Sequence, residues 1–401
     1  MRVLFAVAGG PSHLYPLIPL ARALRQAGHQ VCLAGPPRAT ETMRDTGLST
    51  VSVGTGPRLS AQARADLVDT AYGQPPWPAD WPAHPDTLTP AQARLLEVLG
   101  RYTVAAAEAV ADGLVEFARR WRPDLIIHDT LALSAAIAAT VVGVPHLRYT
   151  HGTQDAFLVE YRLDGRPLPG LAGLFERFGL EPPPRPGNYL DTVPPSMFIG
   201  AERPAIAMRY VPYNGPGAAP GGLTGRRRPR VCLTWGLVVP GALGPAATDP
   251  YRAAIAAITR TGVEVLALVS PERLAALGTA PPGARYLAGT PLRLVLPHCD
   301  AIVHHGGEGS AMTAACLAVP QLTITREPLD DQCGGRLAGT GAAIHLRHQH
   351  VRADPTRIAR AVEQLLSEPG YTARARALRD DVDRQPAPSE VVATLAGRPG
   401  T

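Results

Sequence analysis

Residues 300–310 read DAIVHHGGEGS, and residues 311–317 continue as AMTAACL. The apolar run predicts a buried strand, the glycines predict a tight turn, and the stretch from Ala311 to Leu317 predicts a helix. Glycines let a backbone approach a ligand closely, and the unpaired N–H groups at a helix start attract an anion such as a phosphate. Ser310 can cap this helix, and a histidine beside the turn can donate to the same anion. From the spacing alone, a tight turn with two structural histidines fits equally well.

Strands and helices alternate along the rest of the chain. In the first half, the apolar pattern predicts strands at Val3–Ala8, Gln30–Ala34 and Asp124–Ile127, and helices from Leu17 to Gly28 and from Ala132 to Val142. In the second half, it predicts strands at Arg230–Thr234, Val263–Val269 and Ala301–His305, and a helix at Tyr251–Arg260. This alternation is typical of an α/β protein with parallel, doubly wound sheets.

The length of 401 residues indicates two domains of about 200 residues each. Residues 213–229 read YNGPGAAPGGLTGRRRP, which has the features of a linker and not those of a helix or strand. We therefore predict an N-terminal Rossmann-like domain over residues 1–212 and a C-terminal one over residues 230–401. Ligands of open α/β sheets bind outside the carboxyl ends of the strands, so we expect the functional site in a deep cleft between the domains.

The composition is that of a globular protein, with 45% apolar and 18% charged residues. The formal charge is +5, but the one dense basic run, Arg226–Arg228, has no interleaved aromatic residues, which argues against nucleic-acid binding. The five cysteines are scattered without a CxxC spacing, so reduced thiols are expected instead of a zinc or redox site. The sequence opens on a strand pattern and no apolar run approaches about 18 residues, so we expect a cytoplasmic protein without a membrane span.

The stretch HHGGEGS at residues 304–310 resembles the HHGGxGT signature of nucleotide-sugar-dependent glycosyltransferases with the two-domain GT-B fold. The likeness continues through residues 289–292 and 296–300 before it, and through residues 318–321 and 330–332 after it. The resemblance implies two Rossmann-like domains that face a deep cleft, with the acceptor bound by the first and the nucleotide sugar by the second.

The resemblance also implies roles for residues of the second half. The diphosphate is expected at His305, Gly307, Gly309 and Ser310, the donor sugar at Asp331 and Gln332, and the base near the backbone of Leu292. Two features depart from the family pattern. The stretch between Pro320 and Asp331 is about two residues longer, and Leu237 stands where the family often has a serine or threonine.

A catalytic base is expected in the first half, because a hydroxyl acceptor must lose its proton as it attacks an anomeric carbon. His13 lies in the loop after the first predicted strand, and a neutral histidine suits this role. By position alone, His13 could instead cap the following helix. The loop SHLYP at residues 12–16 resembles that of the family branch that decorates polyketides and related antibiotics, whose single histidine is the proposed base. Pro11 stands where many other members have a further histidine.

A basic imidazole usually needs a carboxylate behind it, and Asp129, at the end of a predicted strand, is the candidate orienter or acceptor contact. A helix cap before Leu131 is the competing interpretation of Asp129. His128, His151 and Asp155 lie at similar strand ends and are interpreted as scaffold. The region from Arg58 to Arg101 is interpreted as irregular loop and helix that shape an acceptor pocket for a polycyclic or macrocyclic aglycone.

The resulting hypothesis is an inverting, metal-independent glycosyltransferase of antibiotic biosynthesis. The resemblance implies a dTDP-deoxysugar as donor and a natural-product aglycone such as a polyketide as acceptor, with no other cofactor. The alternatives are a sugar-nucleotide epimerase of the same fold and a non-catalytic protein that binds a nucleotide or a partner. Transfer to a carbon acceptor, a requirement for a helper protein, and a homodimer stay open.

Overall fold

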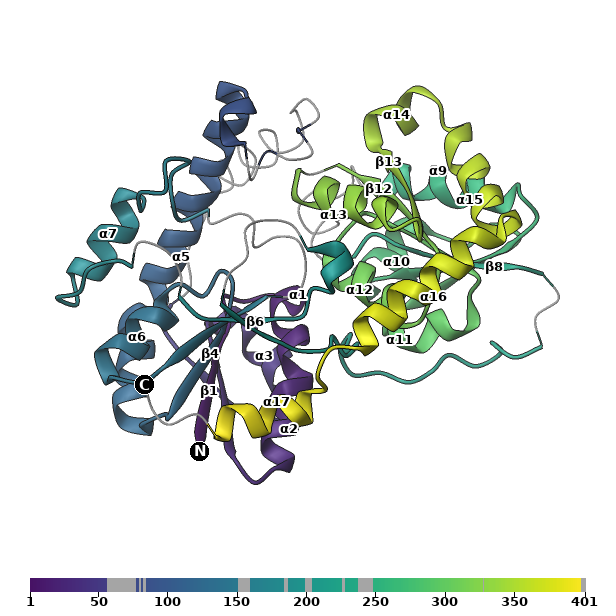
Figure 1. Cartoon of the computed structure of the whole chain (residues 1–401). Coiled ribbons are helices and arrows are strands. Elements are labelled where there is room, and N and C mark those ends of the chain that lie inside the picture. The colour runs from purple at the N-terminus through teal and green to yellow at the C-terminus, as the bar shows by residue number, and fades with distance from the viewer. Residues whose placement is uncertain are drawn as a thin grey trace. The chain divides into compact units, whose positions relative to one another are not determined.

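The computed structural model describes residues 1–55, 77–78, 81, 84–150, 159–183, 187–198, 204–225, 228–236, 248–326 and 328–397. The chain divides into two compact units. Unit 1 consists of Met1–Val193, Ile199–Arg209 and Gln385–Thr401, and unit 2 consists of Pro194–Phe198 and Tyr210–Arg384. Each unit is built around its own twisted sheet flanked by helices (Figure 1).

Unit 1 contains, within the described residues, a seven-stranded sheet in the order β3-β2-β1-β4-β5-β6-β7. All neighbouring strands in it pair in parallel. The strands are β1 (Arg2–Ala6), β2 (Gln30–Gly35), β3 (Ser49–Ser52), β4 (Leu125–Asp129), β5 (His146–Thr150), β6 (Tyr189–Asp191) and β7 (Ala205–Ala207). The central strand β4 is buried along its whole length, which is why it reads as a continuous apolar run up to Ile127.

Helices cover both faces of the unit 1 sheet, with α5, α6 and α7 on one face and α2, α3 and α17 on the other (Figure 1). The helices of this unit are α1 (Pro11–Leu14), α2 (Ile18–Gln26), α3 (Thr40–Arg44), α5 (Pro90–Trp121), α6 (Ser134–Val142), α7 (Pro169–Glu176) and α17 (Pro388–Ala396), with short 3₁₀ turns at Tyr15–Leu17, Pro37–Ala39 and Pro85–Thr87. The long helix α5 begins with a capping box, in which Thr89 and Gln92 each accept the other's backbone N–H. It ends at Arg122, which adopts a left-handed conformation.

Unit 2 contains, in the part of the chain that the structure describes, a six-stranded parallel sheet in the order β10-β9-β8-β11-β12-β13. Its strands are β8 (Arg230–Thr234), β9 (Glu264–Val269), β10 (Ala284–Ala288), β11 (Ala301–His304), β12 (Gln321–Thr325) and β13 (Ala343–Arg347). Its helices are α9 (Thr248–Thr259), α10 (Pro271–Leu277), α11 (Leu292–Val295), α12 (Glu308–Cys316), α13 (Pro328–Gly339), α14 (His348–Ala353), α15 (Thr356–Ser367) and α16 (Pro369–Asp383), with 3₁₀ turns at Pro195–Met197 and Leu296–His298. None of the helices in the described residues is long and apolar enough to cross a membrane.

The two units differ from the domain ranges expected from the sequence at two places. Residues 213–229, expected as a linker, belong to unit 2, where Leu223 packs in the core and its carbonyl accepts a hydrogen bond from the buried Arg230. The last residues of the chain, expected in the second domain, belong to unit 1, because α17 packs against α2. The physical reason is that α17 buries Val391, Val392 and Leu395 and must cover an apolar surface.

The packing of α17 on α2 predicts that unit 1 depends on this C-terminal helix for its stability. Val391→Ser should lower the free energy of unfolding of unit 1 by about 2 kcal/mol, because it removes buried methyl groups and buries a hydroxyl. It should also speed amide hydrogen exchange in α2. The matched control is Ala393→Ser on the exposed face of the same helix, which should change stability by about 0.5 kcal/mol or less. Unchanged exchange in α2 in the Val391→Ser variant would contradict the packing of α17 on that helix.

Candidate functional site

The carboxyl edge of the unit 1 sheet brings His13 and Asp129 together. His13 lies in the short helix α1 after β1, and its Nδ1 is 3.6 Å from Asp129 Oδ1 at the end of β4. The His13 side chain is 22% exposed and the Asp129 side chain 1%. Their closeness follows from the register of β1 and β4, which pairs Ala6 with His128, so that the loop after β1 passes beside Asp129.

Asp129 also organises the two loops around it. Its Oδ2 accepts the N–H of Ala8 at 2.5 Å, and its Oδ1 accepts the N–H of Leu131 at 2.8 Å. The second bond forms a local turn and is not the helix cap of the competing interpretation, because α6 begins at Ser134 and its N-cap residue is Leu133. The carboxylate therefore holds this turn and also lies against His13. Tyr149 holds the segment that follows His13. Its buried hydroxyl donates a hydrogen bond to the carbonyl of Pro16 at 2.8 Å.

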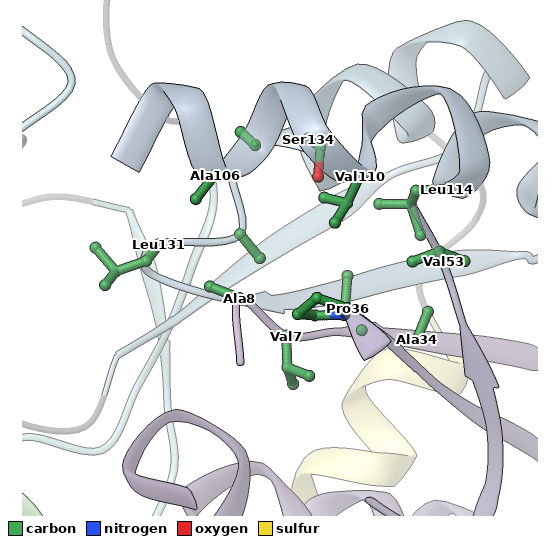
Figure 2. Close-up of a pocket in the computed structure, with 14 residues that line it drawn as sticks. Val7, Ala8, Ala34, Pro36, Val53, Ala106, Val110, Leu114, Leu131 and Ser134 are labelled. Carbon is green, nitrogen blue, oxygen red and sulfur yellow. The ribbon is translucent and has the colours of Figure 1, made fainter. Parts of the chain in front are cut away.

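A small, partly open pocket lies next to the loops that Asp129 holds, and Figure 2 shows the residues that line it. Its walls are mostly small apolar side chains from the ends of β1 and β2, from α5 and from the start of α6: Ala6, Val7, Ala8, Ala34, Gly35, Pro36, Val53, Ala106, Ala107, Val110, Leu114, Leu131, Ala132 and Ser134. Ala8 and Leu131 belong both to this wall and to the loops held by Asp129. Ser134 is 1% exposed, and its hydroxyl has no hydrogen-bond partner among the described residues.

Sequence reasoning placed the acceptor pocket in residues 58–101, most of which lie outside the described residues. It missed Ser134 and the α5 wall, because a helix of alanines and valines carries no chemical signal of its own. His151 and Asp155 also lie outside the described residues. His128 is scaffold: its Nδ1 lies 3.0 Å from the carbonyl of Asp129 and its Nε2 3.1 Å from His146 Nδ1. Burial, His146 and Arg148 lower the pKa of His128 well below its usual value.

The glycine-rich turn of unit 2 connects β11 to α12. Gly306 has φ +102°, and a side chain there would collide with Thr325 and Asp330, so glycine is required. The helix begins at Glu308, earlier than expected, and its N-cap residue is Gly307, which provides no side-chain cap. Ser310 therefore lies in the first turn of α12 and is not its cap, which corrects the prediction. The helix start offers N–H groups to an anion.

His304 fixes the shape of this turn from inside the unit. It is completely buried, its Nδ1 accepts the N–H of Gly306 at 3.2 Å, and its Nε2 lies 2.9 Å from Gln321 Oε1. Burial lowers the pKa of His304 to about 4, although the bond to Gln321 opposes this shift. A neutral ring that accepts at Nδ1 and donates at Nε2 satisfies both contacts.

His305 lies between two glycines. A Cβ on Gly236 would lie 2.5 Å from His305 Cε1, and a Cβ on Gly307 would collide with His305 Nε2, so these glycines make room for the ring. Its Nδ1 is buried and has no hydrogen-bond partner in the described part of the chain. Burial, with a smaller contribution from His304, lowers the pKa of His305 to about 3. His305 is therefore a neutral hydrogen-bonding group at the turn.

Asp331 and Gln332 are neighbours on α13 with different surroundings. The Asp331 carboxylate accepts hydrogen bonds from Thr325 Oγ1 at 2.9 Å, from His345 Nε2 at 3.0 Å and from Arg347, which binds both oxygens. Burial raises the pKa of Asp331, but the bonds from His345 and Arg347 outweigh this and lower it to about 2. Sequence analysis did not predict this clamp, because its members lie on the three separate elements β12, α13 and β13.

Gln332 offers the more available contact on α13. It is 6% exposed, and neither its Oε1 nor its Nε2 has a hydrogen-bond partner in the described residues. Leu292, the residue expected near the base, opens α11 and packs into the core with 7% of its surface exposed. Leu237, the departure from the family's phosphate loop, lies outside the described residues. The described residues contain no group of three or more His, Cys, Asp or Glu side chains that could hold a metal ion.

Comparisons with known proteins identify the family of the chain. The chain matches the family described as erythromycin biosynthesis protein CIII-like, through its N-terminal domain over residues 22–236 and its C-terminal domain over residues 252–397. A curated relative, the aklavinone 7-beta-L-rhodosaminyltransferase of Streptomyces galilaeus, is 34% identical over 98% of this chain and 95% of its own length.

Solved structures show the same likeness over the whole chain. The spinosyn rhamnosyltransferase SpnG complexed with thymidine diphosphate has a TM-score of 0.82 at 28% identity, covering 99% of this chain and 100% of its own. The glycosyltransferase VinC in complex with dTDP has a TM-score of 0.78 at 31% identity, covering 99% of this chain and 98% of its own. These matches confirm the GT-B fold and favour sugar transfer over the epimerase and non-catalytic alternatives. The chain belongs to the erythromycin biosynthesis protein CIII-like family and is a natural-product glycosyltransferase of antibiotic biosynthesis.

Proposed function

We propose that this protein transfers a deoxysugar from a dTDP-sugar to a hydroxyl group of a natural-product aglycone, with inversion at the anomeric carbon. The observation that carries the proposal is the His13 imidazole held 3.6 Å from the buried Asp129 carboxylate at the carboxyl edge of the unit 1 sheet. A carboxylate at Nδ1 orients the ring and stabilises the imidazolium that forms when Nε2 takes a proton.

The transfer is one displacement. The acceptor O–H gives its proton to His13 while its oxygen forms a bond to the anomeric carbon. The bond from that carbon to the diphosphate oxygen breaks, and the electron pair leaves with dTDP. Attack from the face opposite the leaving group inverts the configuration. The charge that develops on the diphosphate is stabilised by the N–H groups at the start of α12 and by a hydrogen bond from His305.

The donor contacts that we propose lie in unit 2. Gly307, Gly309 and Ser310 bring the α12 backbone to the diphosphate, and His305 donates to it from its place beside Gly307. Gln332 is the stronger candidate for a sugar hydroxyl, because both ends of its amide are unpartnered in the described residues, whereas Asp331 is already bound by His345 and Arg347. The base contact is assigned to the backbone at Leu292. The dTDP complexes of SpnG and VinC support thymidine diphosphate as the nucleotide.

For the acceptor, we propose an aglycone with an apolar body. The small pocket beside Asp129 has an almost entirely apolar wall, which could pack against part of an apolar aglycone. The name of the Streptomyces galilaeus relative, with aklavinone as acceptor, supports this class. Transfer to oxygen is proposed because the His13 pair provides the base that a hydroxyl requires. The purified chain tests two further points, which are whether transfer requires a helper protein and whether the protein forms a homodimer.

The first test concerns the base. His13→Ala should lower kcat for transfer from a dTDP-deoxysugar by about 10²- to 10⁴-fold, the usual contribution of a general base, and should leave the Kd for dTDP within about twofold. Asp129→Asn should also lower kcat, because it removes the charge beside His13 and one of the two acceptors for the Ala8 and Leu131 N–H groups. Turnover is measured by chromatography with aklavinone among the acceptors, and dTDP binding by calorimetry. His29→Ala, a histidine at the opposite edge of unit 1, is the matched control. Unchanged turnover in His13→Ala would refute the assignment.

The second test concerns the anion site. His305→Ala should weaken dTDP binding by about 10- to 100-fold, because it removes a hydrogen bond to a charged group worth about 1.5–3 kcal/mol. Thymidine binding should change by less than about threefold, since that nucleoside lacks the diphosphate. The control is His350→Ala on the exposed face of α14. Equal losses for dTDP and thymidine would point to a general loss of structure and contradict a diphosphate contact.

A further inference from the structure

The segment that precedes β8 contacts two helices of the proposed donor site, α11 and α12. Residues 210–217 read YVPYNGPG, and Asn214 within it is partly buried between the start of α11 and the middle of α12. Its Oδ1 accepts the N–H of Arg293 at 2.9 Å, and its Nδ2 donates to Thr313 Oγ1 at 3.0 Å. Arg293 is the second residue of α11 and Thr313 lies on α12, so one carboxamide joins the two helices.

The connection continues to the turn that is proposed to bind the diphosphate. Thr313 is completely buried, and its hydroxyl donates to the carbonyl of Gly309 at 2.6 Å, in the first turn of α12. At the other end, Arg293 directly follows Leu292, the proposed base contact. An unbroken series of three hydrogen bonds therefore leads from the backbone beside the base contact, through Asn214 and Thr313, to the backbone of a proposed diphosphate contact.

The position of Asn214 is fixed by its neighbours in the segment. Arg293 Nη1 donates to the carbonyl of Gly215 at 2.7 Å, and its guanidinium lies 5.4 Å from the centre of the Tyr213 ring. A Cβ on Gly217 would lie 2.5 Å from Pro291 Cδ, so the segment lies directly against the turn that begins α11. Asn214 is therefore placed by the packing of residues 213–217 and does not depend on its own two bonds for its location.

The chemistry at this position requires a carboxamide. The N–H of Arg293 lies in the first turn of α11, where no helical carbonyl can accept it, so it needs an acceptor from elsewhere. The hydroxyl of Thr313 donates to Gly309 and also contacts the Tyr210 side chain, so towards Asn214 it acts as an acceptor and is matched by a donor. An asparagine side chain provides one acceptor and one donor in a fixed plane, whereas an aspartate offers acceptors alone.

We propose that Asn214 is a positioning residue that holds the base-binding and diphosphate-binding halves of the donor site at a fixed spacing. It touches neither half of the nucleotide and acts through Arg293 and Thr313. The inference rests on the proposed function, since it concerns that donor site. A ligand that spans both halves gains from this spacing, because the protein does not have to order the two helices against each other when the ligand binds.

The test compares dTDP with its two separate halves. Asn214→Ala should raise the Kd of dTDP by about tenfold, within the range expected for the loss of buried hydrogen bonds. The Kd values of pyrophosphate and of thymidine, measured by competition against dTDP, should each change by less than about twofold. Asn214→Asp keeps the acceptor for the Arg293 N–H but cannot donate to Thr313, so it breaks the connection between the two helices and its loss for dTDP should match that of Asn214→Ala.

Two further variants show whether Asn214 acts through Thr313. Thr313→Val should reproduce the loss for dTDP, and the double variant with Asn214→Ala should lose no more than either single variant. Thr313→Ser keeps the hydroxyl and should bind dTDP nearly as well as the unmodified protein. If Asn214→Ala does not fold, the Kd values of dTDP, pyrophosphate and thymidine are compared in Thr313→Val and Thr313→Ser instead. The matched control is Arg285→Ala, which removes the bond from Arg285 Nη1 to the Gly221 carbonyl, at another point of the same segment.

Three outcomes overturn the inference. The first is a dTDP affinity that Asn214→Ala leaves unchanged. The second is a loss for pyrophosphate or thymidine as large as that for dTDP, which would mean that Asn214 supports the local fold alone. The third is additive losses in the double variant. If the unmodified protein fails to bind dTDP at all, the proposed donor falls, and the inference falls with it, so that failure is distinguished from the other three.

Discussion

The parallel pairing of the central strands is the constraint on which both candidate sites depend. Parallel strands end at the same edge of a sheet, so residues far apart in the sequence meet there. In unit 1, the pairing of Ala6 with His128 brings the loop that carries His13 beside Asp129. In unit 2, the pairing of His304 with Thr234 and with Thr323 places the glycine turn beside Gly236 and near Thr325.

Buried polar groups give each site its shape. In unit 1, the Asp129 carboxylate holds two backbone amides while it lies against His13. In unit 2, the neutral His304 ring fixes the N–H of Gly306 from inside. An unpaired buried donor or acceptor costs free energy, so these groups specify one arrangement of the loops. Within the described residues, the buried amide of Gln332 and the buried hydroxyl of Ser134 have no hydrogen-bond partner, in contrast to these groups.

A terminal helix and an irregular segment complete the two units. The C-terminal helix α17 covers α2 of unit 1, and the segment from residue 210 to residue 225, which precedes β8, packs within unit 2. The second of these segments supplies Asn214, whose carboxamide joins α11 to α12. A glycine- and proline-rich composition predicts a lack of helix and strand, which is observed, but it does not predict whether such a segment packs against a sheet. The packing of Leu223 and the bonds of Arg230 and Arg293 decide that it does.

The sequence by itself determined the alternation of strands and helices, the position of the glycine turn after β11, and the family, because periodicity and a long local motif are properties of neighbouring residues. It also suggested Asp129 as the carboxylate behind His13, but it could not decide between this role and a helix cap, because 116 positions separate the two residues and only the strand register brings them together. The same reason explains why the clamp of His345 and Arg347 on Asp331 and the role of Asn214 were not foreseen. Contacts between distant segments depend on how the chain packs, and side-chain burial and hydrogen bonding at those contacts were decided by the tertiary structure alone.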